Sequence, residues 1–213
     1  MKLYLLIAVI LLLFPWTGSS ETLLVAEFES GDLSGWEVKE FKGKTDYSVA
    51  YVEARKVLHA KSSASASAML KRIEVDLEKT PWLNWTWRID DTLGPLNELS
   101  KEGDDYPARV YVVISGGLFF WKTRALNYVW SNNQPVGNSW PNAYTSNAVM
   151  LALQSGRKNR GKWIFEKRNV RDDLRKLLGE DYGRIDAVAI MTDTDNGGGE
   201  ASAYYGDMYF TSE

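Results

Sequence analysis

Acidic residues concentrate in two short stretches of the chain. The stretch MTDTDNGGGE carries Asp193 and Asp195, and the stretch GDDYPAR carries Asp104 and Asp105. Paired carboxylates of this kind can work as general acid and base, or they can contact a polar ligand. The alternative is that the same acids form structural ion pairs with arginines. We therefore take these four residues as candidate ligand-binding residues.

The glycine-rich stretch is not a calcium loop of the EF-hand type. Such a loop needs an acid or amide at its fifth position and a glutamate at its twelfth. Counted from Asp193, these positions hold Gly197 and Tyr204. A flexible β-hairpin turn is the structural alternative to a ligand-contacting loop, because Asp, Asn and Gly readily adopt turn conformations.

Two arginines and two aromatic residues complete the candidate ligand-binding set. Arg88 and Arg109 each fall on the polar side of an alternating run, so two neighbouring strands would bring both guanidinium groups to one groove. A guanidinium offers a planar fork for carboxylate or phosphate. Tyr111 and Trp140 add aromatic surface on which a sugar ring could stack. The set favours an acidic or heavily hydroxylated ligand, and the alternative is a network whose charges neutralise one another.

The elements that must position these residues are mostly strands. About ten short runs rich in Val, Ile, Tyr and Trp are separated by turn residues, and this spacing predicts a β-sandwich or barrel. Apolar and polar residues alternate in 82–90 and in 108–114. One segment, 169–179, instead has a helical apolar stripe, with Asn169 as its cap and Gly179 as its stop. We expect an all-β, jelly-roll-like antiparallel β-sandwich with one packed α-helix over 169–179.

Two connections between the predicted strands are unusually long. They span 91–107 and 132–146. Loops beyond about 12 to 15 residues are uncommon and often functional. Because the second connection carries Trp140 and several amides, we expect it to border a site.

The first twenty residues, MKLYLLIAVILLLFPWTGSS, have the layout of a secretory signal. Lys2 precedes an apolar run over 3–14, and small residues follow. We therefore expect a signal peptide over 1–20, a single β-sandwich domain over 21–213, and a periplasmic or secreted bacterial protein. The alternative is an uncleaved anchor. The apolar run is shorter than the roughly 20 residues that cross a bilayer, so we expect no stable membrane span after signal cleavage.

The overall composition narrows the classes of function. The formal net charge is −3 and no block of basic residues occurs, which argues against nucleic acid as a partner. The chain has no cysteine, so it has no thiol nucleophile and no cysteine-based metal site. Its one histidine, His59, is the only residue through which Ser–His–Asp catalysis could run, and no nucleophile motif accompanies it.

Three further acids lie in the first and last predicted strands. Phe28 should point inward, which leaves Glu27 and Glu29 on the outer side, and Asp207 alternates with apolar residues near the C-terminus. If the terminal strands pair, these oxygen ligands could hold a structural Ca²⁺. The alternative is ordinary solvated surface charge.

Several motifs resemble an uncharacterised bacterial family, the domain of unknown function 3047. They include TPWLNWTWRID, GDDYPARVYVV, EKRNVRDDLRKLLG and YYGDMYF, and together with smaller matches they span nearly the whole chain after the signal. The resemblance implies an exported β-sandwich and brings no established activity. FESGDLSGW and YYGDMYF are more loosely similar to galactose-binding-like jelly-roll carbohydrate-binding modules. That similarity implies a structural calcium at Glu27, Glu29 and Asp207.

We expect non-catalytic binding of a glycan or another envelope ligand. One alternative is a carboxylate-dependent polysaccharide hydrolase or lyase, which would show two carboxylates about 5 to 10 Å apart across a cleft. A second alternative is an envelope protein-interaction scaffold, which would show a flat apolar patch.

Overall fold

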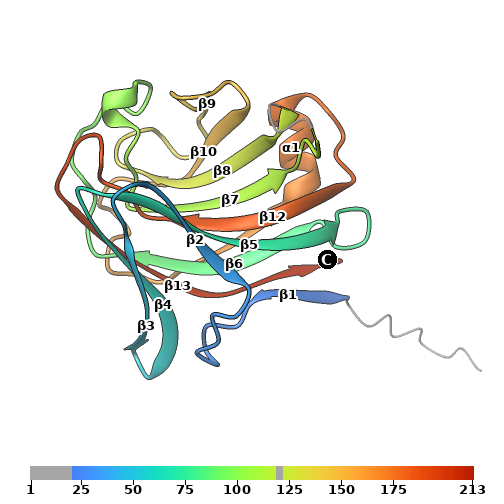
Figure 1. Cartoon of the computed structure of the whole chain (residues 1–213), viewed down its shortest axis with the longest axis horizontal. Coiled ribbons are helices and arrows are strands. Elements are labelled where there is room, and N and C mark those ends of the chain that lie inside the picture. Colours follow the sequence, from blue (N-terminus) through green and yellow to red (C-terminus); the bar gives the residue numbers. More distant parts are fainter. Residues whose placement is uncertain (1–20, 119–121) are drawn as a thin grey trace, which may run out of the picture.

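The computed structural model describes residues 21–118 and 122–213. The strands form two sheets that pack face to face as a jelly-roll-like β-sandwich with one helix (Figure 1), which confirms the predicted fold class. The predicted signal segment, 1–20, lies outside the described residues. Among those that are described, no helix is long and apolar enough to cross a bilayer.

One sheet has six strands in the order β11–β6–β13–β4–β3, with β1 also pairing with β13. The paired terminal strands β1 and β13 run side by side in Figure 1, as the sequence predicts. The bounds of these strands are β1 (Thr22–Ala26), β3 (Asp46–Val52), β4 (Arg55–Ser63), β6 (Trp82–Ile89), β11 (Ile164–Asn169) and β13 (Glu200–Thr211).

The other sheet has seven strands in the order β2–β5–β12–β7–β8–β10–β9. The bounds of these strands are β2 (Trp36–Lys42), β5 (Ala66–Asp76), β7 (Ala108–Ile114), β8 (Arg124–Ser131), β9 (Ser139–Pro141), β10 (Ala148–Ser155) and β12 (Arg184–Met191).

The seven-stranded sheet is not purely antiparallel, because β10 pairs with β8 in the parallel direction. Parallel neighbours need a long connection that returns the chain to the same end of the sheet. The long connection predicted over 132–146 does this, and it contributes β9, which pairs antiparallel with the outer edge of β10. The length of this connection is therefore explained in part by topology.

Aromatic residues fill the space between the sheets. Trp85 and Trp87 of β6 are fully buried, and their rings meet edge to face with centroids 5.5 Å apart. Trp85 packs against Tyr128 and Trp87 packs against Trp130, both on β8 of the other sheet, with centroids 5.4 and 5.9 Å apart. Burying rings of this size contributes much of the stabilisation of such a core. The alternation read from 82–90 is thus confirmed.

The helix α1 (Val170–Leu178) forms where the sequence predicts it. The side chain of Asn169 caps its first turn by accepting a hydrogen bond from the backbone of Asp172, and Gly179 ends it with a φ of 78°. Val170 and Leu174 are buried in the sandwich core. The helix is therefore held by its apolar stripe, as its amphipathic pattern requires.

Candidate functional site

The outer face of the seven-stranded sheet carries Arg109, Tyr111 and Trp140 of the residues predicted to bind ligand, and the four predicted aspartates lie at one end of it. On β7, Val110 and Val112 point into the core, so Arg109 and Tyr111 point to the opposite, outer face. The strand register extends this face across the sheet as a row of directly paired residues. From β12 to β9 the row is Ala189, Tyr111, Asn127, Met150 and Trp140.

Small side chains flank this row on the same face. The adjacent row contains Ala187, Val113, Ala125 and Ala148, which are again paired strand to strand. Ala187 and Ala148 are buried, at 6% and 8% exposure, whereas Val113 and Ala125 are partly exposed. Tyr111, which is itself half-buried, lies beside the partly exposed part of this row.

Asn127 has an unusual position in the centre of the row. Its side chain is only 1% exposed, and its Nδ2 donates a long hydrogen bond of 3.4 Å to the carbonyl of Val149. Its Oδ1 has no hydrogen-bond partner in the described part of the chain. Buried polar atoms are nearly always paired, so this oxygen points to a donor that a ligand or a water would supply.

At the end of this face Arg109 forms a buried ion network. The residues Arg109, Asp193 and Asp104 are 2%, 1% and 5% exposed. Arg109 Nε donates to Asp193 Oδ1 over 2.8 Å, Nη2 donates to Asp193 Oδ2 and to the Asp104 carbonyl, and Nη1 lies 3.6 Å from Asp104 Oδ2. Burial alone would lower the pKa of Arg109, but Asp193 raises it above its ordinary value. The donors of this guanidinium are thus used in hydrogen bonds within the protein. This favours a structural ion network over direct contact of Arg109 with a ligand.

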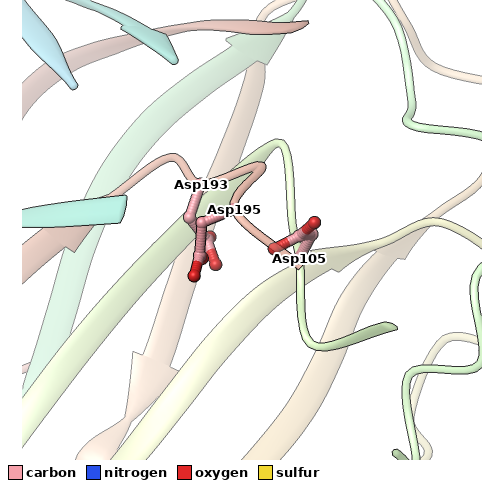
Figure 2. A group of neighbouring side chains, drawn as sticks. All are labelled: Asp105, Asp193 and Asp195. Carbon is pink, nitrogen blue, oxygen red and sulfur yellow. The ribbon is translucent and has the colours of Figure 1, made fainter. Parts of the chain in front are cut away.

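Asp105 and Asp195 lie beside Asp193 at the same end of the sheet. Figure 2 shows Asp193 and Asp195 on one segment and Asp105 on a neighbouring one. Carboxylate oxygens of the three lie within 4.8 Å of one another, and no other group of three potential metal ligands among the described residues is as close. Asp105 accepts hydrogen bonds from the backbone of Asn196 and Gly197, so it also fixes the glycine-rich turn.

This three-aspartate group is the place where the described chain could hold a cation or a shared proton. Burial raises the pKa of Asp193, and Arg109 only partly offsets this. Burial and the neighbouring Asp105 raise the pKa of Asp195. Lys42 Nζ lies 4.0 Å from Asp195 and supplies a second, exposed cation. The connection 192–199 is therefore a turn that is hydrogen-bonded to its surroundings, and its acids lie close together.

Replacing Asp195 with asparagine tests this crowding. The pKa of Asp195 is higher in the folded state than in the unfolded state. At a pH above the folded-state pKa, the ionised carboxylate therefore lowers the free energy of unfolding. Below about pH 3.9 the carboxyl group is protonated in both states, and it has no such effect. We expect Asp195→Asn to raise the melting temperature by about 2 °C at pH 8 and to leave it unchanged near pH 3. Asp46→Asn, at an exposed position, is the control. A gain at pH 3 equal to that at pH 8 would contradict the electrostatic cause.

Glu98 joins the two long connections that the sequence singles out. Its carboxylate is fully buried, and burial raises its pKa. It accepts hydrogen bonds from Ser131 Oγ over 2.6 Å, from Asn132 N over 2.6 Å and from Gln134 N over 3.3 Å. The loop 91–107 and the start of the loop 132–146 are therefore held together beside the outer face.

The predicted groove that combines both arginines does not exist. Arg88 lies on β6 of the six-stranded sheet and Arg109 lies on β7 of the seven-stranded sheet. Each alternates with core residues, so the two side chains point to opposite faces of the sandwich. The prediction needed neighbouring strands, and long-range strand pairing cannot be read from alternation alone.

Trp140 is placed on the outer face but not as an open stacking surface. It is 6% exposed and packs on Tyr106, with ring centroids 6.4 Å apart. Tyr106 in turn lies under Arg109, whose Cζ is 4.2 Å from the ring centroid. Of the two aromatic residues predicted for the site, Tyr111 is the one that is only half-buried.

The terminal acids predicted to hold calcium lie near one another without forming a compact carboxylate cluster. Asp207 Oδ1 accepts a hydrogen bond from the backbone N–H of Glu29 over 3.0 Å. Glu27 and Glu29 are exposed, and Glu27 bridges to Asp32 through the backbone. Calcium binding here stays a prediction.

A melting experiment tests calcium binding at the terminal strands. A cation that binds only the folded state stabilises it by mass action, so calcium should raise the melting temperature and Asp207→Ala should abolish the rise. Glu40→Ala, at an exposed position on β2, should keep it. If neither calcium nor a chelator changed the melting temperature, calcium binding would be contradicted, and these acids would be ordinary solvated surface charges.

Sequence patterns did not single out three residues that matter at this site. Asn127 and Glu98 sit in stretches without a motif, and Tyr106 lies in GDDYPAR, where only the acids and the arginine were selected. The one available signal was for Asn127, an amide in the otherwise apolar strand ALNYVWS. Glu98 is bonded to Ser131, Asn132 and Gln134, and Tyr106 packs on Trp140; these partners are distant in sequence, so only the fold reveals them.

The fold is a jelly-roll β-sandwich, and one outer face carries small, aromatic and amide side chains. The chain belongs to DUF3047, a family of proteins of unknown function, whose model matches residues 34–209. This confirms the resemblance read from the sequence motifs. A search of curated proteins finds no match.

Solved structures with a similar fold include glycan-related proteins. The chain is similar to a family 30 carbohydrate-binding module of a cellulosomal cellulase of Clostridium thermocellum, with a TM-score of 0.51, 10% identity, and coverage of 91% of this chain and 98% of that one. It is also similar to a family 11 carbohydrate-binding module of the same organism (TM-score 0.43, 9% identity, 89% and 94% covered). A third is the endoglucanase Cel12A of Rhodothermus marinus (TM-score 0.45, 10% identity, 88% and 97% covered). At this identity the first likeness shows the fold alone.

Proposed function

We propose that this protein is an exported, non-catalytic glycan-binding module whose binding surface is the outer face of the seven-stranded sheet. The observation that carries this proposal is the unpartnered Oδ1 of Asn127, whose residue lies beside the half-buried Tyr111 and next to one row of small residues. A sugar offers hydroxyl donors for such an oxygen and an apolar ring face for a tyrosine. The likeness of the fold to a carbohydrate-binding module supports the same assignment.

Binding is favoured over hydrolysis by the arrangement of the acids. Glycoside hydrolysis needs two carboxylates about 5 to 10 Å apart on either side of the bond. The three grouped aspartates lie within 4.8 Å of one another and are mostly buried, and Asp193 is held by Arg109. Across the central row described above, the polar groups are a phenol, an amide and an indole N–H, with no carboxylate.

Retention on immobilised polysaccharides tests this function. We expect the wild type to be retarded in gels that contain at least one neutral or acidic polysaccharide. Tyr111→Ala and Asn127→Ala should each weaken binding by roughly tenfold, the equivalent of about 1.4 kcal/mol. Phe165→Ala, which removes a 57% exposed aromatic from β11 of the other sheet, is the matched control and should bind normally.

Two outcomes would contradict the proposal. Absence of retention on every polysaccharide would leave the protein-interaction scaffold as the better assignment. Release of reducing ends from a retained polysaccharide, lost in Asp193→Asn or Asp195→Asn, would make the protein a hydrolase. Both variants should be checked by their melting curves, because Asp193 also belongs to the buried ion network.

A further inference from the structure

A second polar and aromatic cluster lies on the opposite face of the sandwich. On the outer face of the six-stranded sheet, His59 of β4, Tyr204 of β13 and Arg88 of β6 are direct cross-strand neighbours. The rings of His59 and Tyr204 stack with centroids 4.6 Å apart, and Arg88 Cζ lies 5.5 Å from the Tyr204 centroid. Trp163 extends the cluster, with its ring 6.5 Å from that of Tyr204.

Arg55 adds a positive charge that the described residues do not neutralise. Its Cζ lies 4.0 Å from the centroid of Trp163, and no carboxylate of residues 21–118 or 122–213 lies within 4.0 Å of its guanidinium nitrogens. Arg88, by contrast, is paired with Glu53 over 3.2 Å and lies 4.0 Å from Asp90. Arg55 is half-buried, and its planar guanidinium lies over the indole ring of Trp163.

Two N–H groups of this cluster also lack acceptors. Arg88 Nε and Trp163 Nε1 are buried atoms with no hydrogen-bond partner in the described structure. Buried donors are usually paired. Three groups around Tyr204 and Trp163 therefore have donating capacity that the described residues do not use. All three can donate to an oxygen-rich partner, and the two guanidinium groups favour one that is negatively charged.

We propose that Arg55, Arg88, Trp163 and Tyr204 form a second ligand site, which binds a carboxylate-bearing sugar unit of an acidic glycan. The carboxylate would accept from the guanidinium of Arg55, and the sugar ring would pack against the half-buried aromatic rings. The site lies on the opposite face from Tyr111 and Asn127, so it can exist whether or not the seven-stranded sheet binds glycan. A free inorganic anion also carries negative charge, so sulfate is the probe that separates simple anion binding from saccharide binding.

Calorimetric titration of the full chain tests the second site. The probes are tri-galacturonate, the neutral trimer maltotriose, and sodium sulfate at matched ionic strength. We expect tri-galacturonate to bind, with affinity that falls as salt rises. Arg55→Ala should weaken it by about tenfold or more, whereas Arg184→Ala, which removes an exposed arginine on β12, should leave it unchanged.

The remaining variants and probes decide between the outcomes. Maltotriose should not bind at this site, because it has no carboxylate for the guanidinium of Arg55. Equal binding of sulfate and tri-galacturonate would overturn the saccharide assignment and leave a simple anion site. No binding of tri-galacturonate, or binding that Arg55→Ala leaves intact, would overturn the site itself.

Discussion

Replacing Arg109 with alanine is expected to lower the free energy of unfolding by about 3–5 kcal/mol, because it strands buried carboxylates without their cation. Asp193 is 1% exposed and loses both of its guanidinium hydrogen bonds, and Asp104 loses its ion pair. For a chain of this length the melting temperature should fall by roughly 10 °C. Urea denaturation at neutral pH measures the change directly.

Arg184→Ala is the matched control for this loss. Its side chain is 60% exposed and pairs with the exposed Glu74, so we expect a change of less than about 1 kcal/mol. If Arg109→Ala unfolded as the control does but no longer bound polysaccharide, Arg109 would be a ligand contact and the structural assignment would be wrong.

Replacing Glu98 with alanine is expected to cost about 3 kcal/mol and to loosen both long connections. The change leaves Ser131 Oγ and the backbone N–H groups of Asn132 and Gln134 without their buried acceptor. Hydrogen exchange at the Asn132 and Gln134 amides should become faster in the variant. Glu102→Ala, at an exposed position in the same connection, should change neither stability nor exchange. Unchanged exchange in Glu98→Ala would show that the two loops hold together without this carboxylate.

Local patterns in the sequence were sufficient to predict the architecture. Alternation in 82–90 identified the buried faces of Trp85 and Trp87, and the capped apolar stripe identified the helix that begins at Val170. Both patterns follow from the local backbone geometry of a single strand or a single helix. The parallel pairing of β10 with β8 was not predicted, because it depends on how a long loop crosses the sheet.

The candidate site could be predicted only in part for the same reason. Asp104, Asp105, Arg109, Asp193 and Asp195 do come together, since two strand ends and two turns meet at one end of the seven-stranded sheet. Arg88 was grouped with them wrongly, because alternation shows which side of a strand a residue faces and not which sheet the strand joins. The burial of Arg109 could not be predicted either. Its position on the polar side of a strand suggests a surface residue, but it is buried in the folded protein.

The most direct test of the glycan-binding surface is a map of amide chemical shifts on isotope-labelled protein. A soluble oligosaccharide prepared from the polysaccharide that retains the wild type best would be titrated into it. We predict that the largest changes fall on Tyr111, Asn127 and the neighbouring alanines 125, 148, 187 and 189, which share the outer face of the seven-stranded sheet. Changes confined to the six-stranded sheet around Tyr204, or an absence of changes at saturating oligosaccharide, would contradict the assignment of this face as the glycan-binding surface.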